Sequence, residues 1–252
     1  MQHSAWVTTA AAAVTVKDAT YSYPGAATPA LDGASLEVTT GEITGLIGVN
    51  GAGKSTILKA LMGILAPSGG TLQILGLAPE QARRTGLVGY VPQAEDIDED
   101  FPLTVRDVVG MGRYGRLGIT RRLGRADRVA VADALEQVQL ADLADRRIGR
   151  LSGGQRRRVF VARGLAQDAQ VLLLDEPFSG VDKRSEAVIV AVLRALTARG
   201  GAVLVSTHDL AALPELADRA VLLHHRVLAS GTPAEVLTPA NLALAFGGED
   251  LR

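Results

Sequence analysis

Short apolar runs alternate along the chain with stretches in which apolar residues recur at helical spacing. The runs at 42–48, 171–177 and 202–209 have the length and composition of buried strands. The segments 54–65 and 184–198 instead show the periodicity of helices that pack by one face. Strands that alternate with helices favour an α/β fold with a largely parallel central sheet.

Further strand-like segments and one different region complete this pattern. The additional strands are expected at 19–25, 34–40, 71–75, 87–91, 219–224 and 226–231. Between 94 and 150 there is no strand-like run, and an acidic stretch is followed by a charged helical pattern at 125–143. We therefore expect a helical insertion in the α/β core.

The composition is that of a folded globular protein. Of 252 residues, 47% are hydrophobic and 21% are charged, which excludes a disordered chain. The net charge of −1 gives no overall attraction to nucleic acid or anionic lipid, and the lack of cysteine excludes disulfides and thiolate metal sites. No apolar run reaches the roughly 18 residues of a membrane span, and residues 1–14 make a poor signal peptide. We expect residues 1–13 to be a disordered tail and the chain to stay in the cytosol.

A glycine-rich segment follows the strand expected at 42–48. Its sequence GVNGAGKST fits the phosphate-binding pattern G-x-x-x-x-G-K-[ST], with Gly48, Gly53, Lys54 and Ser55 in the required places. Glycines let backbone N–H groups turn towards phosphate oxygens, the lysine adds a charge at the β- and γ-phosphates, and the serine offers a hydroxyl to Mg²⁺. The helix that begins near Lys54 directs its positive dipole end at the same anion. The position between an apolar strand and a helix favours a phosphate-binding loop over a chance glycine turn.

Polar residues also end three other expected strands. Asp175 and Glu176 follow the apolar residues VLLL, where the aspartate can hold Mg²⁺ or its water and the glutamate can act as a base towards an attacking water. His208 ends another expected strand and can reach a γ-phosphate there, although a lone histidine is more often structural. Gln93 ends a third, where its amide can touch Mg²⁺ or the attacking water, although alone it is a weak indication.

The segment LSGGQ at 151–155 opens an amphipathic helix. A glycine pair at a helix start costs backbone entropy and helix propensity, so we expect another group to approach that backbone closely. Free N–H groups at a helix N-terminus bind anions, which makes a phosphate the expected group near Ser152, Gly153 and Gly154. A polar helix cap with two glycines is the alternative.

In this order, the motifs resemble those of the nucleotide-binding subunit of ABC transporters. The resemblance covers roughly residues 14–247, and LSGGQ is close to diagnostic of the family. It implies a P-loop NTPase-type α/β fold: a RecA-like core with a mostly parallel sheet, an antiparallel β subdomain, and a helical subdomain that carries LSGGQ. The single ABC ATPase domain would span 14–252, with the core and β subdomain in 14–93 and 169–237, the helical subdomain in 94–168 and a C-terminal tail in 238–252.

The same resemblance implies an ATPase that uses ATP and Mg²⁺, and it assigns roles to the matching residues. Catalysis would involve Glu176, His208 and Gln93, and Mg²⁺ would be bound by Ser55, Gln93 and Asp175. Tyr23 takes the place of the aromatic residue that stacks on adenine, with Tyr21 as the nearby alternative, and Asp182 in SGVD fits the loop that links the two ATP sites. The residues expected to contact the nucleotide are Tyr23, Gly48, Asn50, Gly51, Gly53, Lys54, Ser55, Thr56, Ser152, Gly153, Gly154, Gln155, Asp175 and Asp182.

The chain contains one phosphate-binding loop and one LSGGQ segment. In the family, LSGGQ faces the γ-phosphate of ATP held by the other subunit, which implies a head-to-tail homodimer with two shared ATP sites. Of the three arginines after LSGGQ, Arg158 fits the family pattern, and we expect Arg156 and Arg157 to lie on the solvated surface. We expect His224 and His225, adjacent in a strand, to point to opposite faces and to be structural rather than metal ligands.

Several longer stretches resemble the manganese, zinc and iron importer branch of the family. These are FPLTVRDVVGMGRYGRLG, EPFSGVD, STHDL and LTPANLALAFGG, and importers of siderophores and cobalamin carry similar stretches. In the family, the segment near 93–117 docks the membrane permease. The residues that could line this groove are Phe101, Pro102, Leu103, Met111 and Tyr114, with the acidic run 95–100 at its rim, and the alternative for each is an ordinary core position.

The resemblance therefore implies the ATP-hydrolysing subunit of an importer for transition-metal ions. The subunit would lie at the cytoplasmic face of the membrane, bind permease subunits, and depend indirectly on an extracytoplasmic metal-binding protein. The alternatives are an iron-siderophore or cobalamin importer and, from another class, a soluble ABC ATPase acting as a clamp on DNA or ribosomes. Because the chain has one cassette, no heptad run and no basic excess, we expect no nucleic acid partner. LSGGQ and the position of Glu176 also argue against a P-loop kinase or GTPase.

Overall fold

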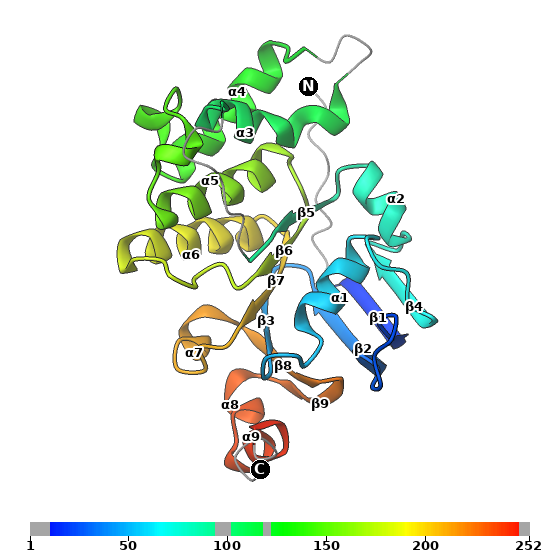
Figure 1. Ribbon diagram of the computed structural model, residues 1–252. Coiled ribbons are helices and arrows are strands. Elements are labelled where there is room, and N and C mark those ends of the chain that lie inside the picture. Colours follow the sequence, from blue (N-terminus) through cyan, green and yellow to red (C-terminus); the bar gives the residue numbers. More distant parts are fainter. Residues whose placement is uncertain (1–10, 94–101, 118–121, 247–252) are drawn as a thin grey trace.

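Two β-sheets and a group of helices make up the part of the chain that the structure, a computed structural model, describes: residues 11–93, 102–117 and 122–246 (Figure 1). The larger sheet has six strands in the order β5-β6-β7-β3-β8-β9. All neighbours in it are parallel except the last pair, β8 and β9. Its strands are β3 (Ile43–Ile47), β5 (Val88–Val91), β6 (Val171–Asp175), β7 (Ala202–Thr207), β8 (Arg219–His224) and β9 (Arg226–Gly231).

Helices cover both faces of this sheet, which explains why its strands are apolar throughout. Alternate residues of a strand face opposite sides. Ile43 and Ile47 of β3 join the core beneath α5 (Gly153–Ala166) and α6 (Lys183–Ala198), whereas Leu46 joins the core beneath α1 (Lys54–Leu61). The predicted α/β fold with a mostly parallel sheet is confirmed.

A smaller antiparallel sheet, in the order β2-β1-β4, packs with α1 (Figure 1). Its strands are β1 (Ala12–Tyr21), β2 (Leu31–Thr39) and β4 (Gly69–Ile74). The strand predicted at 19–25 was misplaced, because β1 begins at Ala12 and ends at Tyr21. The tail predicted for 1–13 therefore overlaps β1 by two residues, where Ala13 is fully buried. The rest of that prediction, residues 1–10, lies outside the described residues.

Helices fill the described part of the predicted insertion, and no strand lies in its residues 102–117 and 122–150. They are α3 (Val105–Gly110) and α4 (Arg125–Gln137), with the short 3-10 turns η1 (Met111–Arg116), η2 (Ala141–Leu143) and η3 (Ile148–Arg150). Arg113 ties them to α5, since its Nε donates to Asp127 of α4 at 2.9 Å and its guanidinium donates to the Ala166 carbonyl at 3.0 Å. The predicted helical subdomain that carries LSGGQ is thus present.

The remaining helices are short and lie mainly in connections. They are α2 (Pro79–Arg84), α7 (Leu213–Leu216), α8 (Pro233–Val236) and α9 (Pro239–Phe246). Helix α9 occupies the first part of the segment assigned to the C-terminal tail. None of the helices in the described ranges is both long and apolar enough to cross a membrane.

Candidate functional site

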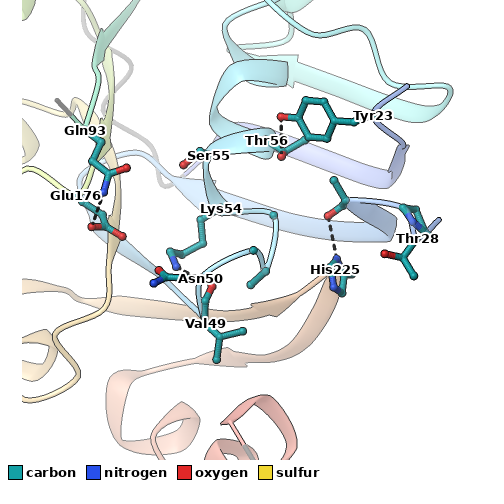
Figure 2. Close-up of a pocket in the computed structure, with 15 residues that line it drawn as sticks. Tyr23, Thr28, Val49, Asn50, Lys54, Ser55, Thr56, Gln93, Glu176 and His225 are labelled. Carbon is teal, nitrogen blue, oxygen red and sulfur yellow. Dashed lines mark hydrogen bonds between the residues drawn. The ribbon is translucent and has the colours of Figure 1, made fainter. Parts of the chain in front are cut away.

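The ends of three neighbouring parallel strands bring the candidate residues together. Strand β7 lies between β3 and β6, so the loops after Ile47, Asp175 and Thr207 leave the sheet at the same edge. Ligands of open α/β sheets bind at this edge, beyond the carboxyl ends of the strands. A cavity of about 440 Å³ opens here, lined by the glycine-rich loop and by Tyr23, Gln93 and Glu176 (Figure 2).

Packing within the chain explains two glycines of the loop, while a third is open. A Cβ atom at Gly48 would lie 2.2 Å from the Leu223 carbonyl, and one at Gly53 would lie 2.5 Å from the Ala30 carbonyl. Gly53 also has a φ of 101°, which disfavours any other residue. Gly51, with a φ of 84°, has no group of the described residues within 4 Å of that position, so among them its backbone faces open space beside the cavity.

Lys54 is the first residue of α1 and borders the cavity although it is only 6% exposed. Its Nζ atom donates to the carbonyls of Gly48 at 2.6 Å and Val49 at 3.0 Å. Burial lowers the pKa of Lys54, and the nearby carboxylates of Glu176 and Asp175 oppose that shift. The loop thus holds a desolvated ammonium group against the cavity, where an anion would be attracted strongly.

Asp175 and Glu176, at the end of β6, are both held by Ser206 of β7. The Ser206 hydroxyl donates to Asp175 Oδ1 at 2.7 Å and accepts from the Glu176 N–H at 2.9 Å. Asp175 is 2% exposed, and the Tyr90 hydroxyl lies 3.5 Å from its other oxygen. Glu176 has a φ of 46°, a conformation that a residue with a side chain seldom adopts and that the fixed surroundings maintain.

Gln93, Glu176 and His208 meet at the edge of the cavity. The Gln93 side-chain amide donates to Glu176 Oε2 at 3.0 Å, and His208 Nδ1 lies 3.3 Å from the same oxygen. Figure 2 shows Gln93 and Glu176 joined in this way, opposite Lys54. The side chain of His208 is 62% exposed, so it is not a core histidine. Its partner in the structure is the site residue Glu176.

Tyr23 lies at the other end of the same cavity (Figure 2). Its hydroxyl is 3.2 Å from the Thr56 hydroxyl, and the residue is 40% exposed. Tyr21 packs edge-on against it with 5.0 Å between the ring centroids. Tyr21 is not among the cavity residues, so the exposed ring face belongs to Tyr23. The other predicted residues of the loop, Asn50, Ser55 and Thr56, also line the cavity.

The two glycines of LSGGQ have different surroundings. A Cβ atom at Gly154 would lie 2.6 Å from Asp182 Oδ2 and 2.8 Å from Ser185 Oγ, so Gly154 is required by packing against the start of α6. Gly153 is exposed, and the nearest group, the Gly180 carbonyl, would be 3.9 Å away. The group expected to approach the glycine pair is therefore, at Gly154, the start of α6 of the same chain. Gly153 remains accessible to another group.

Ser152 and Gln155 close the first turn of α5 on each other. The Ser152 hydroxyl accepts from the Gln155 N–H at 3.3 Å, and the Gln155 side chain accepts from the Ser152 N–H at 3.0 Å. Asp182 caps α6 in the same manner, accepting from Ser185 N–H and Oγ at 2.9 Å, and these bonds lower the pKa of Asp182. None of the LSGGQ residues lines the cavity around Lys54.

Two predictions about basic and histidine side chains were wrong. Arg157 is half-buried and donates to the carbonyls of Pro92 and Gln93, so it is not a solvated surface residue. His225 lies in the turn after β8 with a φ of 58°, which brings its ring to 4.9 Å from that of His224 instead of to the opposite face. Its Nδ1 atom lies 3.4 Å from the Ala30 carbonyl (Figure 2).

Arg158, which fits the family pattern, lies in the interior of the protein. Arg158 is buried and donates to the Val138 carbonyl at 2.8 Å, which anchors α5 to the end of α4.

The described residues of the predicted permease groove differ in exposure. Tyr114 is 57% exposed, Pro102 is exposed, and Leu103 and Met111 are half-buried. Phe101 and the acidic run 95–100 lie outside the described residues.

Sequence reasoning did not identify Ser206, although the signal was present. A serine inside the otherwise apolar strand AVLVST, beside the strand that ends in the acidic pair, marks a buried hydroxyl that needs a partner. Parallel pairing places Ser206 directly beside Asp175.

Known proteins match this chain over most of its length. The family model described as ABC transporter matches residues 31–179. The manganese transport system ATP-binding protein MntA of Synechocystis sp. is 46% identical, over 87% of this chain and 84% of its own length. The zinc transport system ATP-binding protein TroB of Treponema pallidum is 43% identical, over 96% of this chain and 90% of its own. A solved inward-facing ABC transporter, described as putatively of the metal-chelate type, aligns with a TM-score of 0.82 and 28% identity, over 94% of this chain and 90% of that one.

The segment matched by the family model contains the glycine-rich loop, LSGGQ and the acidic pair at 175–176. The alignments with the two relatives, over 219 and 242 residues, also take in β7 and His208. The chain therefore belongs to the ABC transporter family, as an ATP-binding subunit that hydrolyses ATP.

Proposed function

We propose that this subunit drives an importer for a transition-metal ion, manganese, zinc or iron, through a separate membrane permease. The observation that carries the catalytic part of the proposal is the meeting of Gln93, Glu176 and His208 beside the loop of Lys54. The relatives named for manganese and zinc transport support the metal substrate. Because those two relatives are similarly identical to this chain, they do not distinguish between the metals.

The cavity has the groups needed to bind a nucleoside triphosphate. The exposed Tyr23 ring supplies a stacking surface for adenine, and the loop backbone from Asn50 to Thr56 supplies N–H donors to the phosphates. Lys54 adds its charge at the β- and γ-phosphates. To do so, its Nζ atom turns from the Gly48 and Val49 carbonyls towards the phosphate oxygens.

The side chains at the sheet edge also suit Mg²⁺, which prefers oxygen ligands. The candidate ligands are the Ser55 hydroxyl, the Asp175 carboxylate and the Gln93 amide oxygen. Asp175 fits because, within the described part of the chain, its Oδ1 atom has a short hydrogen bond, at 2.7 Å, while its Oδ2 atom lies 3.5 Å from the Tyr90 hydroxyl. When bound, the ion would neutralise charge on the β- and γ-phosphates.

Glu176 is the proposed general base. Its carboxylate accepts a proton from the water that attacks the γ-phosphate, while Gln93 and His208 hold its Oε2 atom in place. His208 is exposed enough to turn from Glu176 towards a γ-phosphate. The backbone of Glu176 is fixed through Ser206, so the base is positioned from both ends.

The site requires a second copy of the chain in this proposal. LSGGQ lies away from the cavity of its own chain, and its Gly153 is accessible. A head-to-tail homodimer would place Ser152, Gly153, Gly154 and Gln155 of each subunit against the γ-phosphate of the other. Asp182, which packs on Gly154, would then link the two sites.

The permease is proposed to dock on the segment near 93–117. In support, Tyr114 and Pro102 are exposed and Leu103 and Met111 are half-buried, so this segment offers apolar side chains that a partner could cover. The subunit would sit at the cytoplasmic face of the membrane, and an extracytoplasmic protein would deliver the metal to the permease. The net charge of −1 gives no support for nucleic acid as a partner.

Metal uptake in a host that lacks this chain tests the proposal. Wild type should restore uptake of radiolabelled manganese or zinc, and Glu176→Gln should restore neither. Glu136→Gln, on the exposed face of α4, is the matched control and should behave as wild type. If the host takes up manganese and zinc equally well without the chain, these two metals are not its substrates, and if iron uptake is also unchanged, the proposed metal substrate is wrong.

A chelate importer is the second candidate, because the aligned structure is described as a transporter of the metal-chelate type. In that case the same host would regain uptake of an iron-siderophore complex or cobalamin with wild type and not with Glu176→Gln. Free manganese and zinc uptake would then be independent of the chain.

A further inference from the structure

One side of α5 carries a series of hydrogen-bond donors that face the outer edge of β5. Strand β5 is the edge strand of the large sheet, and the Leu87 carbonyl just before it already accepts from the Gln170 and Val171 amides on the β6 side. Carbonyls alternate in direction along a strand, so those of Val88 and Tyr90 point outwards. These outward groups would lack a strand partner.

Side chains of α5 and its C-terminal cap bind these outward carbonyls in sequence. Gln167, at the C-terminal end of the helix, donates to Gly86 at 3.1 Å and Val88 at 2.7 Å. Arg163 donates to Tyr90 at 3.3 Å while its guanidinium lies over the Phe160 ring. The helix runs antiparallel to the strand, so each donor one or two turns earlier reaches further along β5.

Arg157 is the last donor in this series and reaches beyond the strand. Its two terminal nitrogens donate to the carbonyls of Pro92 and Gln93. A guanidinium is a planar fork that binds two acceptors in a fixed geometry. It therefore fixes the backbone from which the Gln93 side chain reaches Glu176 Oε2.

We propose that Arg157 is a positioning residue that couples the LSGGQ turn of α5 to the Gln93–Glu176 pair. Arg157 lies two residues after Gln155, so a shift of the LSGGQ turn moves the guanidinium and, with it, the backbone of Gln93. Arg157 does not touch the reacting atoms. It acts through Gln93, which orients the base.

This inference rests on the proposed function, in which LSGGQ and Glu176 of one chain serve different ATP sites of the dimer. Phosphate bound at LSGGQ in one site would then bias the position of Gln93 in the other. Such a link predicts that ATP hydrolysis by the dimer is cooperative and that Arg157 carries part of the coupling.

Three variants separate positioning from simple support of the strand. Arg157→Met keeps the length of the side chain and removes both donors, and Arg157→Lys restores a charged donor without the fork. Gln167→Met is the matched control, because it removes two bonds from the same helix to the same strand without touching Gln93. The measurements are the kcat, KM and Hill coefficient of ATP hydrolysis, with the melting temperature of each protein.

Arg157→Met should lower kcat about tenfold with KM changed less than about twofold, and should bring the Hill coefficient towards one. Arg157→Lys should recover part of the kcat, and Gln167→Met should lower the melting temperature but leave kcat within about twofold of wild type. If Arg157→Met lowers kcat no more than Gln167→Met, Arg157 only supports the strand and the inference is wrong. Should Arg157→Met fail to fold, Arg157→Gln replaces it in the same comparison.

The same assay, together with gel filtration of the wild-type protein in the presence of ATP, distinguishes the two proposals. Wild-type protein that hydrolyses ATP without forming a dimer would overturn the shared-site function. A cooperative wild-type dimer whose kcat and Hill coefficient are unchanged by Arg157→Met would overturn the role of Arg157 alone.

Discussion

Ser206 donates a 2.7 Å hydrogen bond to Asp175 across the boundary between β7 and β6. The bond is fully buried, and the same hydroxyl accepts from the backbone of the neighbouring Glu176. One side chain thus fixes the proposed metal ligand and the proposed base relative to each other. The geometry of the acidic pair therefore depends on both β6 and β7.

Ser206→Ala should cost about 1–3 kcal/mol of unfolding free energy, because it leaves a buried carboxylate oxygen without its partner. It should also lower kcat for ATP about tenfold through the misplaced Glu176. Urea unfolding and steady-state ATP hydrolysis measure the two effects.

Thr44→Val, in the adjacent strand β3, is the control for this change. Thr44 is equally buried, but among the described residues its hydroxyl has no hydrogen-bond partner. Replacement by an apolar group of the same shape should therefore be neutral or stabilising. Equal losses of stability in both variants would contradict the assigned role of Ser206.

The glycine pair of LSGGQ should respond unequally to alanine. Gly154→Ala places a methyl group 2.6 Å from Asp182 Oδ2, so it should destabilise the fold by about 1–3 kcal/mol through overpacking. Gly153→Ala has room within the chain and should unfold like wild type. Its expected defect is weaker ATP-dependent dimerisation, which gel filtration with ATP measures. A Gly153→Ala protein that dimerises normally would contradict phosphate binding at this residue.

Purified Glu176→Gln should bind ATP normally and turn it over at least about a hundredfold more slowly, since an amide cannot accept the proton of the attacking water. It should accumulate as an ATP-bound dimer. The amide oxygen introduced at position 176 can still accept from the Gln93 side chain, so the fold of the variant should remain intact. Equal turnover by the variant and by wild type would refute the assignment of the base.

The pair Arg113–Asp127 makes stability depend on pH. The hydrogen bond from Arg113 holds the pKa of Asp127 below its usual range. A carboxylate with a lowered pKa stabilises the fold above its unfolded pKa of about 4, and this contribution is lost as the pH falls through the lower folded value. Asp127→Asn should therefore cost about 1–2 kcal/mol at pH 7 and progressively less below about pH 4.

Urea unfolding at pH 7 and at pH 3 measures that difference. Asp145→Asn is the control, because its partner Arg106 is half-exposed and surface pairs contribute about 0–1 kcal/mol. A gap between wild type and Asp127→Asn that stays constant with pH would contradict a contribution from the charge of Asp127.

Most of the central sheet and the cavity could be predicted because the inner strands are apolar runs, and those that lead into the site are followed by glycine or by polar residues. The glycine-rich loop, Glu176 and His208 are visible in this way. Strand β1 was misplaced although its residues VTV at 14–16 are typical of a strand. Only its first two residues, Ala12 and Ala13, have low strand propensity, and Ala12 pairs with β2 in the structure.

Contacts between distant segments could not be predicted. Arg157 resembles any surface arginine until β5 is placed beside α5, and Gly154 resembles a ligand-binding glycine until α6 packs on it. The turn at His225 is another example, because its positive φ depends on hydrogen bonding to the glycine-rich loop through Ala52.

The side chains that cover the outer edge of β5 also matter for solubility. An open strand edge is a template for another chain, and proteins avoid aggregation by blocking it. Here Gln167 and Arg163 bind the carbonyls that an incoming strand would need. Helix α5 therefore keeps the sheet from growing, and a shortened protein without its helical subdomain would be expected to precipitate through this edge.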